Sequence, residues 1–333
     1  MTINPVLGRE VKERFRRRWT PLFVTLWLAT VAAVGYLSYL VGRGWLGSFL
    51  GPGLGTVAAV GLGRFMFESL ALVLLTAVLF VVPGIAALAI VGERERLTLP
   101  LLQVTQLRPG QIVRGKLLAS LAYMTLLVAA VAPLLVLPIL LGGVTVADAT
   151  AALVVIAATA LVVGAASLWI SARARSVRGA VAAAYLVPFF LAVVTLLALA
   201  GEIVLFRAAP NDTFGPTGRE LYAAWPNPYV ALVSAVDEPI RSRGAGLPTP
   251  FQAIDELLIR RQGGRQGVNF RDALFFAFGV EGPDEELAVN RGFLWHRSLL
   301  LYGIVTVVAL VAATRHVTVP RRGRRVKEPA DAT

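Results

Sequence analysis

The 333-residue sequence has no cysteine, only two histidines and few charged residues. The missing cysteines exclude disulfides and thiolate chemistry, and two histidines leave little to build a metal site. Charged residues make up 16% of the chain, against about 25% in soluble domains, while 56% of it is hydrophobic. A soluble fold could not bury so many long apolar runs. We therefore expect an all-α membrane protein that is not itself an enzyme, with no catalytic residue, metal or cofactor site in this chain.

Six stretches are long enough to cross a bilayer, which takes about 20 apolar residues per helix. They are 21–41, 65–91, 117–141, 151–170, 180–201 and 293–313. The segment 1–20 is a seventh feature, in which Leu7, Val11, Phe15 and Trp19 recur every four residues and basic residues, among them Arg16, Arg17 and Arg18, fill the rest. This pattern favours a helix lying in the membrane interface, although it also suits a plain positive flank for the first span.

Lysine and arginine predict the orientation, because they gather in short cytoplasmic segments. The segments 1–20, 92–116, 171–179 and 314–333 hold 20 of them, whereas the opposite short loops hold only Arg43 and Arg64. Both ends are therefore expected in the cytoplasm, with 207–292 outside and 314–333 as a basic inner tail. The net charge of +12 reflects this asymmetry, so we predict contact with membrane lipids and no nucleic-acid partner. The chain has 29 arginines and only 3 lysines, which points to a GC-rich bacterial genome. We therefore expect the protein in a bacterial plasma (inner) membrane.

The middles of the predicted spans lack Asp, Glu, His and Lys, the residues that ion-coupled transporters usually carry there. A charge at mid-membrane costs about 2.5–3.5 kcal/mol, so an uncharged interior suits a lipophilic or amphipathic cargo. Glu68 and Glu202 lie near the outer ends of their spans. Each is interpreted either as an interfacial group, Glu68 being wet or paired with Arg64, or as a contact at the mouth of a transport pathway.

Residues 110–116 spell G-x-x-x-x-G-K, which resembles a phosphate-binding loop. The next residue is Leu117 where such a loop needs a magnesium-binding Ser or Thr, and no buried strand precedes it. We therefore expect no ATP site here. Lys116 is predicted to end the loop, with its ammonium extended to the lipid headgroups.

Residues 91–118, "VGERERLTLPLLQVTQLRPGQIVRGKLL", form the loop between spans two and three. Pro100 favours the first turn of a short helix, and Leu101, Leu102 and Val104 give that helix an apolar face. Arg108-Pro109-Gly110 is expected to turn the chain back to the membrane. Such a helix suits docking into a groove on a partner, with a helix lying flat on lipid as the alternative.

This loop resembles that of ABC-2 type permeases, the membrane subunits of ATP-binding-cassette exporters, whose pattern is E-R-E-x-G-T-L-E-x-L-L-x-T-P-L-S followed by G-K. The positions at which the chain departs from the pattern include Leu97, Pro100, Gln106 and Arg108. The chain matches at Glu93, Arg94, Glu95, Thr98, Leu99, Leu102, Thr105, Leu107, Gly115 and Lys116. The opening "NPVLGRE" and the six-span plan are also similar to that family.

The resemblance implies that the loop 92–116 couples the chain to a separate ATPase subunit, which would bind Mg-ATP, and that two permease copies, identical or related, form a dimer. The coupling residues would be Glu93, Arg94, Glu95, Thr98, Leu99, Leu101, Leu102, Thr105, Leu107 and Arg108. A membrane scaffold without cargo is the main alternative. A membrane-embedded enzyme is a weaker one, because only Glu68, Glu202 and His296 could serve it.

The external segment 207–292 is long, and we expect it to be largely helical. "WPNPYVALVSAV" (225–236) is predicted to form a short helix dipping into the outer leaflet, and "FQAIDELLIRR" an amphipathic one. The acidic cluster at 281–286 fits no calcium loop and is interpreted as a solvated face.

Overall fold

A computed structural model describes residues 8, 19–49, 55–97, 109–207, 222–236, 250–251 and 294–317. These residues are almost entirely helical and contain no strand. Six of their helices are long and apolar enough to cross a membrane. The prediction of an all-helical chain with six such helices is confirmed, and it fits a multi-pass membrane protein.

The six candidate spans are formed by α2 (Trp19–Phe49), α3 (Gly55–Glu95), α5 (Pro109–Leu140), α6 (Val146–Arg173), the continuous run of α7 (Val177–Phe189), η1 (Phe190–Val194) and α8 (Thr195–Arg207), and α12 (Leu294–Val317). Two short elements lie between the fifth and sixth spans. They are the 3-10 turn η2 (Tyr222–Ala224) and the helix α9 (Pro228–Ala235).

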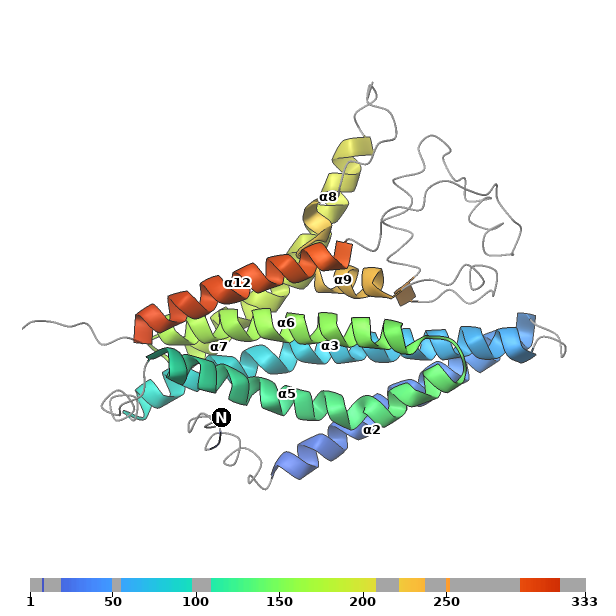
Figure 1. The fold of residues 1–333 in the computed structure, drawn as a ribbon, viewed down its shortest axis with the longest axis horizontal. Helices are drawn as coiled ribbons and strands as arrows, with labels where there is room; N and C mark the ends of the chain where they lie inside the picture. The colour runs from blue at the N-terminus through green and yellow to red at the C-terminus, as the bar shows by residue number, and fades with distance from the viewer. Residues whose placement is uncertain are drawn as a thin grey trace, which may run out of the picture.

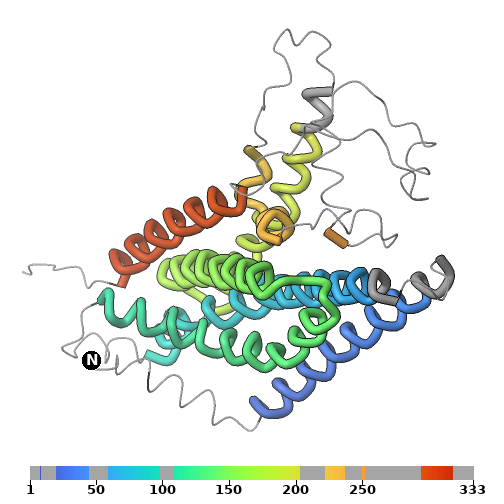
Figure 2. The backbone as a smooth tube through the Cα atoms, turned by 45° about the vertical axis from the view of Figure 1, so that its right-hand side comes forward, coloured from blue at the N-terminus to red at the C-terminus, as the bar shows by residue number. Residues whose placement is uncertain are grey.

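Helices α3 and α6 form the centre of the bundle, with α2 and α5 on one side of it, α12 along the opposite side of α6, and α7 packed against both α3 and α6 (Figure 1). In the apolar stretches of α3 and α6, 56% and 61% of the residues are buried. In the other four candidate spans the buried share is between 17% and 28%. The outer helices therefore present large apolar faces that only lipid or another membrane protein could cover. Figure 2 shows α8 leaving the bundle at a steep angle just after η1.

Helix starts follow local capping chemistry. Thr145 and Asp148 form a reciprocal capping box at the start of α6, with Thr145 N donating to Asp148 Oδ2 at 3.0 Å. Ser176 accepts a hydrogen bond from Gly179 N and caps α7. These caps fix where the chain re-enters the bundle on either side of the fourth span.

Two glycines allow close packing where α3 meets the turn between α5 and α6. A Cβ on Gly143 would collide with the backbone of Gly63 and Arg64, and a Cβ on Gly63 would lie 2.8 Å from Pro138 O. Gly142 also has a φ of +76°, a left-handed conformation that favours glycine. The contact brings this turn against the segment of α3 that carries Arg64.

Several predicted boundaries were wrong, because helices continue past the apolar runs that reveal them. Helix α3 starts at Gly55, within the predicted loop 42–64, and α5 starts at Pro109, where a turn was expected. Proline suits the first helical turn, since the amide it lacks would be unpaired there anyway. The first residues of the predicted tail, 314–317, belong to α12.

Some predictions concern residues that lie mostly outside the described ranges. These are the interfacial helix at 1–20, the coupling segment at 98–108 and most of the external segment after residue 236. Trp19, assigned to the interfacial helix, is the first residue of α2. Leu7, Val11, Phe15, Arg16, Arg17 and Arg18 are outside the described residues.

Candidate functional site

Four helix ends meet at one end of the bundle, and the three residues Glu93, Arg94 and Glu95 at the end of α3 hold them together. Lys116 of α5 lies with its Nζ 2.8 Å from Glu93 Oε1. The lysine side chain is 1% exposed and the glutamate side chain 25% exposed. Because a buried ammonium is strongly disfavoured without a counter-charge, this pair ties α5 to α3.

Arg94 binds the end of α6. Its guanidinium donates to Ala174 O at 2.5 Å and to Ala172 O at 2.8 Å. The last carbonyls of a helix have no partner within it and carry the negative end of its dipole. The arginine therefore caps α6 with both hydrogen bonds and charge.

Glu95 binds the start of α7. Its Oε1 accepts a hydrogen bond from Val177 N at 2.6 Å. An acidic group at a helix N-terminus pairs with an amide that has no carbonyl partner and with the positive end of the dipole. Consecutive residues 93, 94 and 95 thus bind α5, α6 and α7 in turn, and we name this arrangement the junction.

Ser171 of α6 adds a deeper contact beside the junction. Its Oγ donates to Ala87 O at 2.5 Å and lies 3.1 Å from Ile90 N and 3.0 Å from Val91 N, which donate to it. A hydroxyl that enters a helical hydrogen-bond ladder is one of the recognised causes of local bending. The last turns of α3 are therefore fixed to α6 through backbone atoms as well as through Arg94.

The structure corrects the prediction for Lys116. The prediction that it extends to the headgroups was wrong, because its ammonium is buried and paired with Glu93. The structure brings Glu93, Arg94 and Glu95 together with Lys116, the end of α6 and the start of α7. Thr98, Leu99, Leu101, Leu102, Thr105, Leu107 and Arg108 lie outside the described residues, between Leu97 and Pro109.

A second polar group lies at the opposite end of α3. Arg64 Nε donates to Glu68 Oε1 at 2.7 Å, and the two side chains are 4% and 0% exposed. Glu68 Oε2 accepts from Phe251 N at 2.9 Å. The pairing with Arg64 is confirmed and a water-exposed Glu68 is excluded, because the carboxylate is enclosed and also holds part of the segment between spans five and six.

Asn227 is the centre of a third polar group. It caps α9 by accepting from Tyr229 N at 2.9 Å and Val230 N at 3.1 Å, and it is fully buried. Its amide donates to Ala192 O at 3.2 Å and to Thr195 Oγ1 at 2.7 Å. A π-helical turn disrupts the regular carbonyl pairing of a helix, and Asn227 supplies a donor to one carbonyl of η1.

We call residues 222–236 the wedge, because they are held between the spans by further side-chain hydrogen bonds. Tyr229 OH lies 3.1 Å from Thr76 Oγ1 of α3, and Tyr302 OH of α12 donates to Pro226 O at 3.0 Å. Glu202 Oε2 accepts from Ala223 N at 3.3 Å. The predicted short helix within 225–236 is confirmed as α9, which packs against α6 and α12.

These polar groups are engaged in binding helices to one another. Among the described residues no three of His, Cys, Asp or Glu gather in a way that could hold a metal ion. Glu68 and Glu202, the candidates for a pathway mouth, bind the backbone of Phe251 and Ala223. His296 is exposed at the start of α12 and stacks on Trp295, with 3.8 Å between ring centroids.

Sequence reasoning missed Ser171, Asn227 and Tyr302. The Asn-Pro step at 227–228 was a usable signal, since Asn at the cap followed by Pro in the first turn is a common helix start. Ser171 and Tyr302 offered no such signal, because a single Ser or Tyr in an apolar run looks alike whether it faces lipid or another backbone.

No family model matches this chain, and a search of curated proteins finds no match either.

Proposed function

We propose that this chain is the permease subunit of an ABC-2 type exporter, moving a lipophilic or amphipathic cargo with Mg-ATP hydrolysed by a separate subunit. Both described chain ends of the bundle, near residue 19 and residue 317, would then face the cytoplasm of a bacterium whose inner membrane holds the protein. A second permease copy would cover part of the apolar surface.

The junction is the observation that supports this proposal most directly. The segment 98–108, whose sequence resembles a coupling loop, connects Leu97 to Pro109, so both of its ends emerge from the junction. Force applied to that segment would reach α3 and α5 first. Glu93–Lys116, Arg94 and Glu95 would pass it on to α5, α6 and α7. A push on one short loop would therefore displace four helix ends together.

The polar content of the spans supports the cargo class. Within the described part of α3, no charged residue lies between Glu68 and Glu93, and Glu68 is neutralised by Arg64. An interior built this way offers no ionisable group for proton or metal-ion coupling along its central helix. Apolar or amphipathic molecules would meet the smallest desolvation cost in it.

The test uses the full chain together with a soluble ATPase that carries a complete phosphate loop and is encoded beside it. We expect the two proteins to co-purify and the reconstituted complex to hydrolyse ATP. Leu102→Arg should lower hydrolysis by about tenfold or more, since burying a charge in an apolar groove costs more than about 1.4 kcal/mol. Arg178→Gln, at the same end of the bundle but on α7, is the matched control and should keep full activity. Equal hydrolysis by Leu102→Arg and the wild type would overturn the coupling role of this loop.

A further inference from the structure

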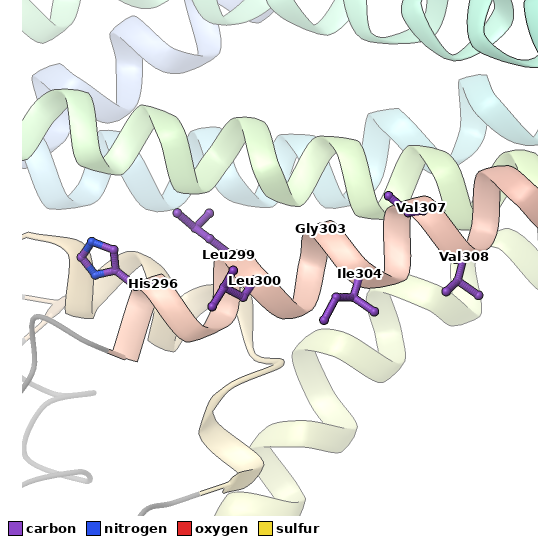
Figure 3. A pocket seen from close by; sticks show the side chains of 7 residues that line it. All are labelled: His296, Leu299, Leu300, Gly303, Ile304, Val307 and Val308. Atoms are coloured by element: carbon purple, nitrogen blue, oxygen red, sulfur yellow. The ribbon is translucent and has the colours of Figure 1, made fainter.

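A groove follows the outer face of α12. One hollow, of about 720 Å³, is lined by His296, Leu299, Leu300, Gly303, Ile304, Val307 and Val308 (Figure 3). A second, of about 500 Å³, is lined by Trp169, Arg173, Val307, Val308, Val311, Ala312, Arg315 and His316. Val307 and Val308 line both hollows, so the two are parts of one groove.

Most of the groove is apolar. Leu300, Ile304 and Val308 are exposed by 69%, 63% and 62%, and Figure 3 shows these three side chains on the side of α12 turned away from α6. From Leu300 to Val311 the helix rises by about 17 Å at 1.5 Å per residue. One leaflet of a bilayer contributes about 15 Å of hydrocarbon, so the apolar floor has the length of one acyl layer.

The end of the groove is cationic. Arg173 of α6 and Arg315 and His316 of α12 line it, and none of the described residues that line it is acidic. Arg173 lies over the ring of Trp169, with 5.4 Å from Cζ to the ring centroid. The ends of α6 and α12 present about half a negative charge each, so together they balance about one of the two guanidinium charges. Among the described lining residues, positive charge therefore predominates where the apolar floor ends.

We propose that this groove binds an anionic phospholipid. Its phosphate would contact Arg173, Arg315 and His316, and an acyl chain would lie along α12 from Val311 toward Leu300. The cationic end and the apolar floor follow one another along the helix axis, in the order of a lipid's headgroup and tail. An acidic peptide would match the cationic end but would leave the apolar floor uncovered, so a lipid is the occupant that fits both parts. The inference does not depend on the permease proposal.

The site lies next to the junction. Arg173 falls between Ala172 and Ala174, whose carbonyls are held by Arg94. A lipid that binds Arg173 would thus contact the last turn of α6, the turn that is hydrogen-bonded to Arg94 of α3. Occupancy of the groove would stabilise the same helix end that the junction positions.

The experiment measures lipid binding to the full-length chain in detergent by native mass spectrometry. The probes are a phosphatidylglycerol and a phosphatidylcholine with identical acyl chains. We expect the wild type to retain phosphatidylglycerol preferentially at one saturable site. Arg173→Gln/Arg315→Gln/His316→Gln should weaken that binding about 30-fold, the equivalent of about 2 kcal/mol for two arginines.

Two further variants separate the proposal from general effects of charge and folding. Arg178→Gln removes an exposed charge at the same end of the bundle but outside the groove, and should bind like the wild type. Gly303→Phe should fill the apolar hollow, since an added Cβ there has no atom within 4 Å, and should weaken phosphatidylglycerol binding while the chain stays folded. Phosphatidylglycerol with six-carbon chains should bind more weakly than the long-chain form.

Three outcomes would overturn the proposal. They are equal retention of the two lipids by the wild type, an equal loss in Arg178→Gln, and competition by inorganic phosphate as effective as that by long-chain lipid. If the triple variant instead loses a co-purifying acidic protein and keeps its lipid, the groove is a protein-docking surface and the lipid proposal fails.

Discussion

Lys116 of α5 and Glu93 of α3 form an ion pair at the junction, with 2.8 Å between Nζ and Oε1. The lysine is enclosed while the glutamate keeps a quarter of its side chain exposed. Because the two side chains differ in exposure, removing one of them should destabilise the protein more than removing the other. The ion pair lies at the junction, where residues 93–95 bind the ends of three other helices.

Glu93→Ala should destabilise the protein more than Lys116→Met. The first change removes the carboxylate beside a buried ammonium, and breaking a buried pair costs about 3–5 kcal/mol. The second leaves a glutamate whose side chain is a quarter exposed and can shift toward solvent, which should cost less. Thermal unfolding of the purified variants, followed by tryptophan fluorescence, measures the order. The double variant should recover most of the loss, and a double variant as unstable as Glu93→Ala would contradict the pairing.

Glu68→Gln should loosen the segment that contains Phe251 as well as destabilise α3. The substitution removes the negative charge that Glu68 places beside Arg64, which is 4% exposed, and weakens the bond to Phe251 N. We expect a loss of about 3 kcal/mol or more and faster proteolysis near residue 251. Ser69→Ala is the matched control on the next position, because Ser69 donates only to Phe65 O within its own helix. Unchanged cleavage in Glu68→Gln would show that the carboxylate does not hold this segment.

Asn227→Ala should detach the wedge from the fifth span. The change removes the cap of α9 and leaves Ala192 O and Thr195 Oγ1 without their donor, together about 2–4 kcal/mol. Ser234→Ala, in the same helix, should cost no more than about 0.5 kcal/mol, since Ser234 donates only to Ala231 O nearby. The two variants are compared by thermal unfolding in one detergent. Similar stability for both would contradict the role of Asn227.

Gly143→Ala should destabilise the contact between α3 and the turn that follows α5. Its Cβ would collide with the backbone of Gly63 and Arg64, which cannot move aside as a flexible side chain could. Gly201→Ala is the control, because an added Cβ there has no atom within 4 Å and alanine favours a helix by about 1 kcal/mol. The expected result is a lowered unfolding temperature for the first variant and an equal or raised one for the second.

The number of spans could be predicted from the sequence because a bilayer demands long apolar runs and this chain supplies six of them. The ends of the helices could not be predicted in this way. Helices α3 and α5 continue through polar residues and glycines, which a hydrophobicity criterion assigns to loops. The prediction for Lys116 failed for the same reason. A lysine at the end of an apolar run looks like a headgroup anchor until the register of α5 against α3 brings it to Glu93.

The candidate site was predictable only in part. The coupling pattern drew attention to Glu93, Arg94 and Glu95, and the structure places all three at the junction, where they bind Lys116, α6 and α7. The cap at Asn227 had a local signal in its Asn-Pro step. The contacts of Ser171, Asn227 and Tyr302 with backbone groups far away in the sequence could not be anticipated. Long-range contacts of this kind depend on packing, which no local pattern encodes.

The most direct test of the account is ATP hydrolysis and lipid-analogue transport by this chain in liposomes, measured with and without the proposed ATPase subunit. The account predicts neither activity from the chain alone, and both from the complex in the presence of Mg-ATP. Hydrolysis or ATP-driven transport by the chain alone would contradict the claim that the force is generated in another subunit and enters through the loop between Leu97 and Pro109.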